Sequence, residues 1–311
     1  MCSFLFTDKQ INDLDFTNHY MKFRGPDFTN RVDVNEYSFV HNLLSITGDF
    51  TVQPFIDNDD EIVCIYNGQI YNYQDFGSFK SDGECLIPLY KNLGPDFIKV
   101  LDGEFAIVLV DFKNDRLIIS TDVFATKPLW FSVGESVTVA SYESALKSLG
   151  HTDAVKLDAN IYRVYNLETR ELLEEKRVFD FDLRQHKTSF DDWRQAFSRS
   201  IEKRTNGLRE KMFIGLSSGY DSGGIACELN KINFPYKAYT VLGSENKDVL
   251  DRRYALFNEN SSGEYIPDNR WDYKGYINTN VEEFMYRIYS SSSNYNEFGT
   301  RLQDDNGSCG L

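Results

Sequence analysis

The stretch EIVCIYNGQIYNY, residues 61–73, is rich in β-branched and aromatic residues and contains Asn and Gly, which often form turns. EFAIVLVDF (104–112) and RLIISTDV (116–123) have a similar composition. Between the first two runs, ECLIPLYKNLG (84–94) repeats apolar residues at helical spacing and ends on Gly94, as helices often do. The first half of the chain is therefore predicted to form packed sheets with helices, a layered α/β domain.

A change of pattern near residue 188 predicts a second domain, so we expect domains at 1–180 and 188–311. In SFDDWRQAFSRSIEKR (189–204) apolar residues recur at helical spacing behind a Ser189 cap, with Asp192 three residues further on. The predicted apolar face of this helix consists of Phe190, Trp193, Phe197 and Ile201.

The second half then alternates between strand and helix patterns. KMFIGLSSGYDSGGIACELNK (211–231) is typical of a strand, a glycine-rich turn and a helix. YKAYTVLG (236–243) follows as a strand and DVLDRRYALFN (248–258) as a helix. This alternation predicts a partial α/β domain with a parallel sheet.

Composition narrows the function. With 48 acidic and 33 basic residues the formal charge is -15, a field that repels nucleic acid and anionic membranes. No run approaches the roughly 20 apolar residues of a membrane span, and the N-terminus lacks a basic region followed by an apolar run. We therefore expect a cytoplasmic protein without nucleic-acid or membrane partners.

The five cysteines and four histidines form no metal-ligand or C-x-x-C spacing, so neither a metal site nor a disulfide framework is expected. Cys64 and Cys227 lie among apolar residues and are expected to be buried.

Cys2 directly follows the initiator methionine. If Met1 is removed, this residue carries a thiol nucleophile and a free α-amine, which titrates near about pH 7 to 8 and can act as a general base. A small residue that simply follows Met1 is the alternative.

Four short stretches occur in order: MCS at 1–3, RGPD at 24–27, YNGQIYNY at 66–73 and SDGE at 81–84. Taken singly, RGPD is an ordinary turn and NG a common hairpin turn. Together they resemble the glutaminase domain of class II glutamine amidotransferases, particularly that of asparagine synthetases. The resemblance continues through LDGEFAIVLVD, DVFATKPLWF and VASYESAL and covers nearly all of residues 1–180. It implies an N-terminal-nucleophile (Ntn) hydrolase fold, an αββα sandwich.

The resemblance assigns Cys2 as the nucleophile that attacks the side-chain amide of glutamine and forms a thioester. The tetrahedral oxyanion needs fixed donors, a role that suits the Asn67 amide and the Gly68 N–H. Asp82 matches the position that binds the substrate ammonium, and Arg24 is expected to support the site. By resemblance, the remaining glutamine-binding positions are Ile46, Thr47 and Gln69.

One position departs from the family. Leu43, in HNLLSIT (41–47), stands where the family has the arginine that holds the substrate carboxylate. A leucine cannot donate a hydrogen bond, and losing such a pair typically costs about 1.5 to 3 kcal/mol. Three explanations stay open: Arg31 or another cation substitutes, the amide donor is not glutamine, or the site has decayed.

LSSGYDSGG (216–224) lies between a predicted strand and helix, where backbone N–H groups can hold an anion. It resembles the S-G-G-x-D-S loop of ATP pyrophosphatases (PP-loop ATPases), with Ser218 in place of a glycine. A Ser/Gly-rich turn without catalytic meaning is the alternative. The residues that match the family's ATP site are Leu216, Ser217, Gly219, Asp221, Ser222 and Val241. The resemblance implies ATP and Mg2+.

The family's second acidic loop, S-G-E-G-x-D-E, is not found. The synthetase domain is therefore expected to be trimmed, to be completed by a partner chain, or to be incomplete in this sequence; a homodimer is a further expected assembly.

The function predicted from the sequence is a glutamine-dependent amidotransferase resembling asparagine synthetase. It would pass ammonia from glutamine to a carboxylic-acid acceptor, such as aspartate, activated by ATP. The alternatives are a lone amidohydrolase with a non-catalytic second domain, and a non-catalytic regulatory protein.

Overall fold

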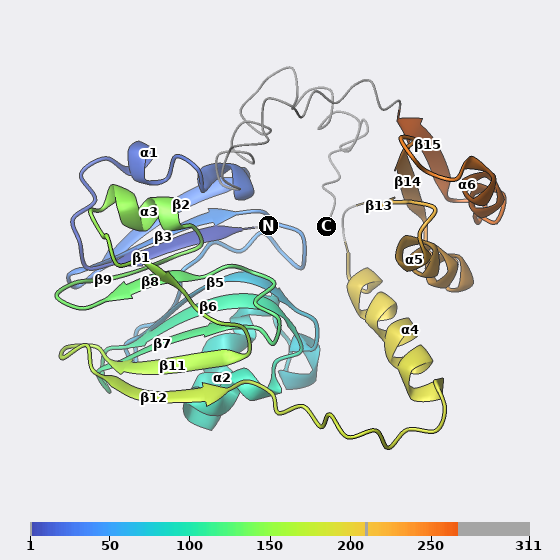
Figure 1. The fold of residues 1–311 in the computed structure, drawn as a ribbon. Helices are drawn as coiled ribbons and strands as arrows, with labels where there is room; N and C mark the ends of the chain where they lie inside the picture. Colours follow the sequence, from blue (N-terminus) through green and yellow to red (C-terminus); the bar gives the residue numbers. More distant parts are fainter. Residues whose placement is uncertain (1, 209–210, 267–311) are drawn as a thin grey trace. The chain divides into compact units, whose positions relative to one another are not determined.

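Two six-stranded antiparallel sheets face each other in the first of the two units into which the chain divides (Figure 1). The units are Met1–Arg184 and Gln185–Leu311. The computed structural model describes residues 2–208 and 211–266, so Met1 and the last part of the predicted second domain lie outside the described residues.

The first sheet has the strand order β10-β8-β9-β1-β3-β2, and the second has the order β12-β11-β7-β6-β5-β4. The strands of the first sheet are β10 (Val155–Lys156), β8 (Trp130–Val133), β9 (Val137–Ala140), β1 (Ser3–Thr7), β3 (Tyr37–Leu43) and β2 (Phe28–Val34). Those of the second are β12 (Leu172–Arg177), β11 (Ile161–Asn166), β7 (Arg116–Thr121), β6 (Gly103–Asp111), β5 (Ile62–Ile70) and β4 (Phe55–Asp57).

The side chains of each strand alternate between two cores, as the period of two of a β-strand requires. On β1, Phe4 and Phe6 pack toward the second sheet, whereas Leu5 packs against helices α1 (Leu14–Thr17) and α3 (Glu143–Ser148). On β5, Val63 and Ile65 point between the sheets, and the residues in between face the helical layer on the other side. That layer consists of α2 (Leu86–Leu93) and the 3-10 segment η4 (Gly94–Val100).

The first unit thus has four layers, helix, sheet, sheet and helix, in agreement with the predicted αββα sandwich (Figure 1). Three further short 3-10 segments are η1 (Lys22–Arg24), η2 (Tyr73–Phe76) and η3 (Asp82–Cys85).

The predicted elements of this half are confirmed, with one correction. The runs at 61–73, 104–112 and 116–123 contain β5, β6 and β7, and α2 ends at Leu93, directly before Gly94, whose positive φ of 60° favours glycine. The hairpin-turn alternative for NG is wrong: Asn67 and Gly68 lie inside β5, opposite Ala106 and Phe105 of β6.

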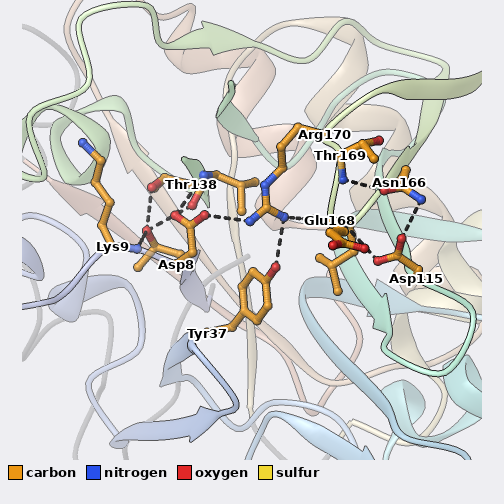
Figure 2. A network of polar contacts seen from close by, with 12 residues as sticks. Asp8, Lys9, Tyr37, Asp115, Thr138, Asn166, Glu168, Thr169 and Arg170 are labelled. Atoms are coloured by element: carbon orange, nitrogen blue, oxygen red, sulfur yellow. Dashed lines mark hydrogen bonds and ion pairs between the residues drawn. The ribbon is translucent and has the colours of Figure 1, made fainter. Parts of the chain in front are cut away.

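A polar network joins the two sheets at one end of the sandwich (Figure 2). Arg170, in the turn between β11 and β12, donates to Asp8 Oδ2 at 2.9 Å and to the Tyr37 hydroxyl at 3.0 Å. Its guanidinium also lies over the Tyr37 ring, 5.5 Å from the centroid. Asp8 follows the last residue of β1, and Cys2 precedes the first, so this network closes the end opposite Cys2.

We expect Arg170→Ala to lower the free energy of unfolding of the first unit by about 2 kcal/mol, because it leaves the mostly buried Asp8 carboxylate without its cation. Arg170→Lys keeps the charge but loses the guanidinium that contacts Asp8 and Tyr37 together, so it should lower the free energy of unfolding by less. Denaturant unfolding of the full chain followed by tyrosine fluorescence measures the change. A loss below about 0.5 kcal/mol for Arg170→Ala would place this pair with ordinary surface pairs.

The second unit contains a three-stranded parallel sheet with helices after its first two strands. Its elements are α4 (Asp191–Thr205), β13 (Met212–Gly215), α5 (Tyr220–Lys231), β14 (Tyr236–Val241), α6 (Lys247–Tyr254) and β15 (Ser262–Ile266). The strand order β13-β14-β15 agrees with the predicted parallel sheet. The core is small and includes Leu216, Leu229 and Leu250.

Three local predictions for this unit are wrong. The residue that precedes the first turn of α4 is Phe190, not Ser189, although Ser189 Oγ accepts a hydrogen bond from the Asp191 N–H at 3.4 Å. Only the C-terminal end of the predicted apolar face is buried: Ile201 packs in the core, whereas Trp193 is 65% exposed. The face of α5 that is buried contains Gly223, Ala226 and Leu229. Cys227 follows Ala226 and lies about 100° further round the helix, so it faces outward and is exposed. Cys64 is buried as predicted.

None of the helices in the described residues combines the length and the apolar character that crossing a membrane requires.

Candidate active site

Cys2 is buried next to the beginning of β1, an internal strand of the first sheet. It directly precedes β1 and has the same alternation as Phe4 and Phe6, which face the second sheet. The Leu44 N–H donates to Cys2 Sγ at 3.3 Å. Burial raises the pKa of the Cys2 thiol, while the Leu44 hydrogen bond and the Arg24 charge oppose the increase. The resting group is therefore a thiol, and it needs a base to become a nucleophile.

Asn67 has the most unusual polar environment of this unit. Its side chain is 0% exposed, and neither Oδ1 nor Nδ2 has a hydrogen-bond partner among the residues that the structure describes. By alternation with Val63 and Ile65, it points between the sheets, the same space that Cys2 faces. Burying an amide without partners costs about 1 to 3 kcal/mol, so an amide kept in this state is a candidate for binding a ligand.

Gly68 permits close contact between β5 and β6. A Cβ at this position would lie 2.0 Å from the Glu104 carbonyl oxygen and 2.7 Å from the Phe105 Cα. No side chain fits in that space, so only glycine allows the backbone beside Asn67 to take this position.

Asp82, the first residue of η3, accepts hydrogen bonds from one residue before and one residue after Asn67 and Gly68 in the sequence of β5. Its Oδ1 accepts from the Tyr66 hydroxyl at 2.7 Å, and its Oδ2 accepts from the Ile70 N–H at 2.8 Å. Burial raises the pKa of the Asp82 carboxyl to about 6, although both hydrogen bonds favour the ionised form. Near neutral pH a carboxylate is thus held next to β5.

The loop that follows β3 links Cys2 with β5. Leu44 bonds Cys2, and the Thr47 hydroxyl accepts from Gln69 Nε2 at 2.5 Å. Ile46 is half-buried in the same loop, and Leu43 is buried at the end of β3.

Arg31 does not replace the missing arginine. It pairs in register with Val40, which packs against the helices, and residues directly opposite in a sheet share a face. Its guanidinium donates to Asp33 at 3.0 Å and to Ser38 at 3.2 Å. Arg31 therefore does not take this role, because it points away from the space that Cys2 faces; substitution by another cation stays a prediction.

Arg24 and the partly buried Lys127–Glu104 ion pair are further charged residues of the first unit. Arg24 is buried, with its guanidinium 5.1 Å from the Tyr142 ring centroid, which fits a supporting role. Lys127 is buried and donates to Glu104 Oε2 at 3.1 Å; Glu104 lies directly opposite Gln69. The sequence analysis missed this pair, although Lys127 lies within the stretch DVFATKPLWF.

In the second unit, the 216–219 loop connects β13 to α5 and is closed by its own hydroxyls. Ser217 Oγ lies 2.8 Å from Ser222 Oγ, and the Gly219 N–H donates to Ser217 Oγ at 3.1 Å. The Ser218 N–H donates to Glu245 Oε2 at 2.5 Å, and the Ser218 hydroxyl bonds the same oxygen. The loop thus presents donors that already hold a carboxylate.

The other candidate ATP residues differ in exposure. Leu216 is 2% exposed and packs in the core, Val241 is 40% exposed at the end of β14, and Asp221 is exposed in the first turn of α5. Within residues 2–208 and 211–266, no three His, Cys, Asp or Glu side chains converge as metal ligands would.

Comparison with known proteins gives consistent results. A family model described as a glutamine amidotransferase domain matches residues 1–180. The amidase chyE of Penicillium rubens is 33% identical over 148 residues, 44% of this chain and 21% of its own length. The glutamine-hydrolyzing asparagine synthetase 1 of Saccharomyces cerevisiae is 29% identical over 231 residues, 66% of this chain and 38% of its own.

The corresponding enzyme of Cricetulus griseus is 26% identical over 274 residues, 74% of this chain and 49% of its own length. The chain thus spans less than half the length of each of these three relatives.

Proposed function

The chain belongs to the family of proteins with a class II glutamine amidotransferase domain, and we propose that its first unit hydrolyses a side-chain amide, that of glutamine, with Cys2 as the nucleophile. The observation that carries this proposal is the Asn67 amide, which is fully buried and lacks partners within the described part of the chain. It faces the same space as Cys2, where an oxyanion would need a donor.

In the proposed reaction, the α-amine of Cys2 accepts the thiol proton, and Sγ attacks the amide carbon. The C–S bond forms, and the carbonyl oxygen becomes an oxyanion that accepts from Asn67 Nδ2 and the Gly68 N–H. The C–N bond then breaks as the amine returns its proton to the departing ammonia, and water cleaves the thioester. The amine is free only after Met1 is removed, and Met1 lies outside the described residues.

The Asp82 carboxylate is the proposed partner of the substrate ammonium, since it is buried and oriented by two fixed donors. Ile46, Thr47 and Gln69 are the proposed lining of the rest of the glutamine site. With Leu43 in place of the family's arginine and Arg31 on the other face, we expect weak binding of the substrate carboxylate.

Leu43 also favours a second candidate, hydrolysis of an amide that lacks this carboxylate. An apolar, buried side chain at the position that would hold a carboxylate suits an uncharged group better. One of the relatives is named an amidase, in keeping with this alternative.

For the second unit, we propose that the 216–219 loop binds the pyrophosphate of ATP and that ammonia reaches a carboxylate activated there. The donors of Ser218 already hold the Glu245 carboxylate, so the loop fits an anionic group. Ser217, Gly219, Asp221 and Ser222 would surround the phosphates, Leu216 and Val241 the adenine, and Mg2+ would neutralise the phosphate charge. The same proposal includes an acceptor such as aspartate, a partner chain or a homodimer, and a cytoplasmic location.

The test of the proposed function is intact mass spectrometry after incubation with 6-diazo-5-oxo-L-norleucine, a reactive glutamine analogue. We expect one adduct on the Met1-free chain, mapped to Cys2, together with glutamate release from glutamine. A Met1-free chain without an adduct would rule out glutamine and leave the second candidate. ATP-dependent release of pyrophosphate in the presence of ammonia tests the second unit separately, and its absence would leave a lone amidohydrolase.

We expect substrate binding to depend on the protonation of Asp82. As the pH falls through about 6, this carboxyl becomes neutral and no longer attracts an ammonium, so KM should rise while kcat changes less.

The contribution of Asp82 to the free energy of unfolding should increase as the pH falls. Because the folded pKa lies above the unfolded value of about 3.9, the contribution of Asp82 to stability is complete below about pH 4 and is lost as the pH rises through about 6. Asp82→Asn should remove both dependences, and a KM that stays flat across this range in the unmodified chain would contradict the assignment.

A further inference from the structure

Arg253, on α6, binds the backbone of the 216–219 loop. Its Nη1 donates to the carbonyl oxygen of Gly219 at 2.8 Å and also to that of Ser217. A guanidinium carries only donors and keeps its charge at any pH that a folded protein meets, so it binds carbonyl oxygens and not N–H groups. Arg253 therefore holds the acceptors of the loop.

Gly223, on α5, leaves room for this side chain. A Cβ at this position would lie 2.5 Å from both Cζ and Nη2 of Arg253. The residue lies within the helix, where glycine costs about 1 kcal/mol relative to alanine, so the helical backbone itself does not favour glycine. The close approach of the guanidinium accounts for a glycine here.

The contact with Arg253 determines which way a peptide group of the loop faces. The bond between Ser217 and Ser218 is trans, so the carbonyl oxygen and the N–H of this peptide group point in opposite directions. Arg253 binds the oxygen, and the N–H donates to Glu245 Oε2 at 2.5 Å on the other side. The Ser218 N–H thus faces the carboxylate, whereas the Ser217 oxygen faces the guanidinium.

The charge of Arg253 acts on the same anion. Hydrogen bonds from the Ser218 hydroxyl and N–H lower the pKa of the Glu245 carboxyl, and the Arg253 charge lowers it further to a smaller extent. A negative group at this end of the loop is therefore favoured by the Ser218 donors and by the cation together.

We propose that Arg253 is a positioning residue for phosphate binding: by holding the Ser217 carbonyl oxygen, it keeps the Ser218 N–H directed at the phosphates of ATP. This inference rests on the proposed function of the second unit. The other bonds to the two oxygens that Arg253 holds are longer, 3.3 Å from Ser222 Oγ to Ser217 and 3.4 Å from the Gly223 N–H to Gly219. Without the guanidinium these peptide groups are held less firmly, and an oxygen that turned toward a phosphate would repel it.

Calorimetric titration of the full chain with inorganic pyrophosphate in the presence of Mg2+ measures the effect. We expect Arg253→Met to raise the dissociation constant about 10- to 100-fold, since it removes the charge-assisted hydrogen bonds that orient the loop. Arg253→Lys keeps the charge but lacks the planar fork of donors, so it should raise the dissociation constant by about threefold to tenfold.

Gly223→Ala separates positioning from charge. The new methyl group would occupy the place of the guanidinium while every charge is kept, and alanine favours the helix, so α5 should stay folded. We expect the dissociation constant to rise about tenfold or more, with the helical circular dichroism unchanged. Adding Arg253→Lys to Gly223→Ala should restore part of the affinity, because lysine lacks the Cζ and Nη2 atoms that the methyl group would contact.

Arg252→Met is the matched control. Arg252 is the neighbouring arginine on α6, but it is exposed and its Nε donates to the Asp248 carbonyl oxygen of its own helix at 3.1 Å. This variant removes the same charge without a contact to the loop, so the dissociation constant should stay within about twofold.

The unmodified chain tests the proposed function itself: if it does not bind pyrophosphate, the phosphate site and this inference are both wrong. If it binds, and Arg253→Met and Gly223→Ala bind equally tightly, this inference alone is overturned. Equal losses in Arg252→Met and Arg253→Met also overturn it, because net charge rather than the contact with the loop would then be responsible.

Discussion

Cys2→Ala should reduce amide hydrolysis to the background rate, a loss of about 10⁴-fold or more, because the substitution removes the atom that forms the thioester. The fold should remain intact. The thiol lies near the chain end, and among the described residues its hydrogen bonds are to the backbone of Leu44. Glutamate release measures the activity, and circular dichroism and thermal unfolding report on the fold.

Cys64→Ala is the matched control for this loss. Cys64 is a fully buried thiol of β5 that packs toward α2, on the face away from Cys2. Its substitution should cost stability through a small cavity but leave hydrolysis and labelling unchanged. Substantial activity in Cys2→Ala would mean that another group is the nucleophile.

Asn67→Leu should lower kcat about 10²- to 10³-fold and at the same time raise stability. The substitution removes a donor to the oxyanion while the Gly68 N–H remains, a loss of the size seen when one such donor is deleted. The buried amide has no partner in the described part of the chain, and replacing it by an apolar group of similar size removes a desolvation cost of about 1 kcal/mol or more. Activity assays and denaturant unfolding of the same preparation measure both effects.

Asn42→Leu is the control for Asn67→Leu, because it replaces a buried amide that does have hydrogen-bond partners. Asn42 is also 0% exposed, but its amide is fully bonded: it exchanges two hydrogen bonds of 2.8 Å with Asn18, accepts from Thr29 and donates to Ser3. This variant should lose about 2 to 4 kcal/mol of stability, because several buried polar groups lose their partner. If Asn67→Leu were destabilising to a similar extent, Asn67 would be a structural residue and not an oxyanion donor.

The strands β5, β6 and β7 were predictable because each is a short, continuous run rich in β-branched and apolar residues, whereas the αββα order of the layers was implied by the family resemblance. The proposed assignment of Cys2, Asn67 and Asp82 to one site was predictable only from the family resemblance. Their elements come from separate parts of the sequence, and nothing in the spacing of residues shows that they meet.

The predictions that failed depend on contacts between residues that are far apart in the sequence. Asn67 and Gly68 carry a strong local turn signal, but pairing with β6 keeps them in a strand. The direction of Arg31 depends on its register with β3, and the exposure of Cys227 depends on which face of α5 packs on the sheet.

If the 216–219 loop binds phosphates as proposed, the Ser218–Glu245 contact gives it a competitor in the same chain. Glu245 lies 27 residues from Ser218 and is covalently connected to it, so diluting the protein does not weaken its competition. An external anion gains access only in the fraction of molecules in which the carboxylate has left, and its apparent dissociation constant rises by the inverse of that fraction. A loop that is open one-tenth of the time would bind pyrophosphate about tenfold more weakly than the same loop without Glu245. In the proposed function, the affinity of this loop for phosphates would therefore depend on how often the Glu245 side chain dissociates as well as on the donors that the loop provides.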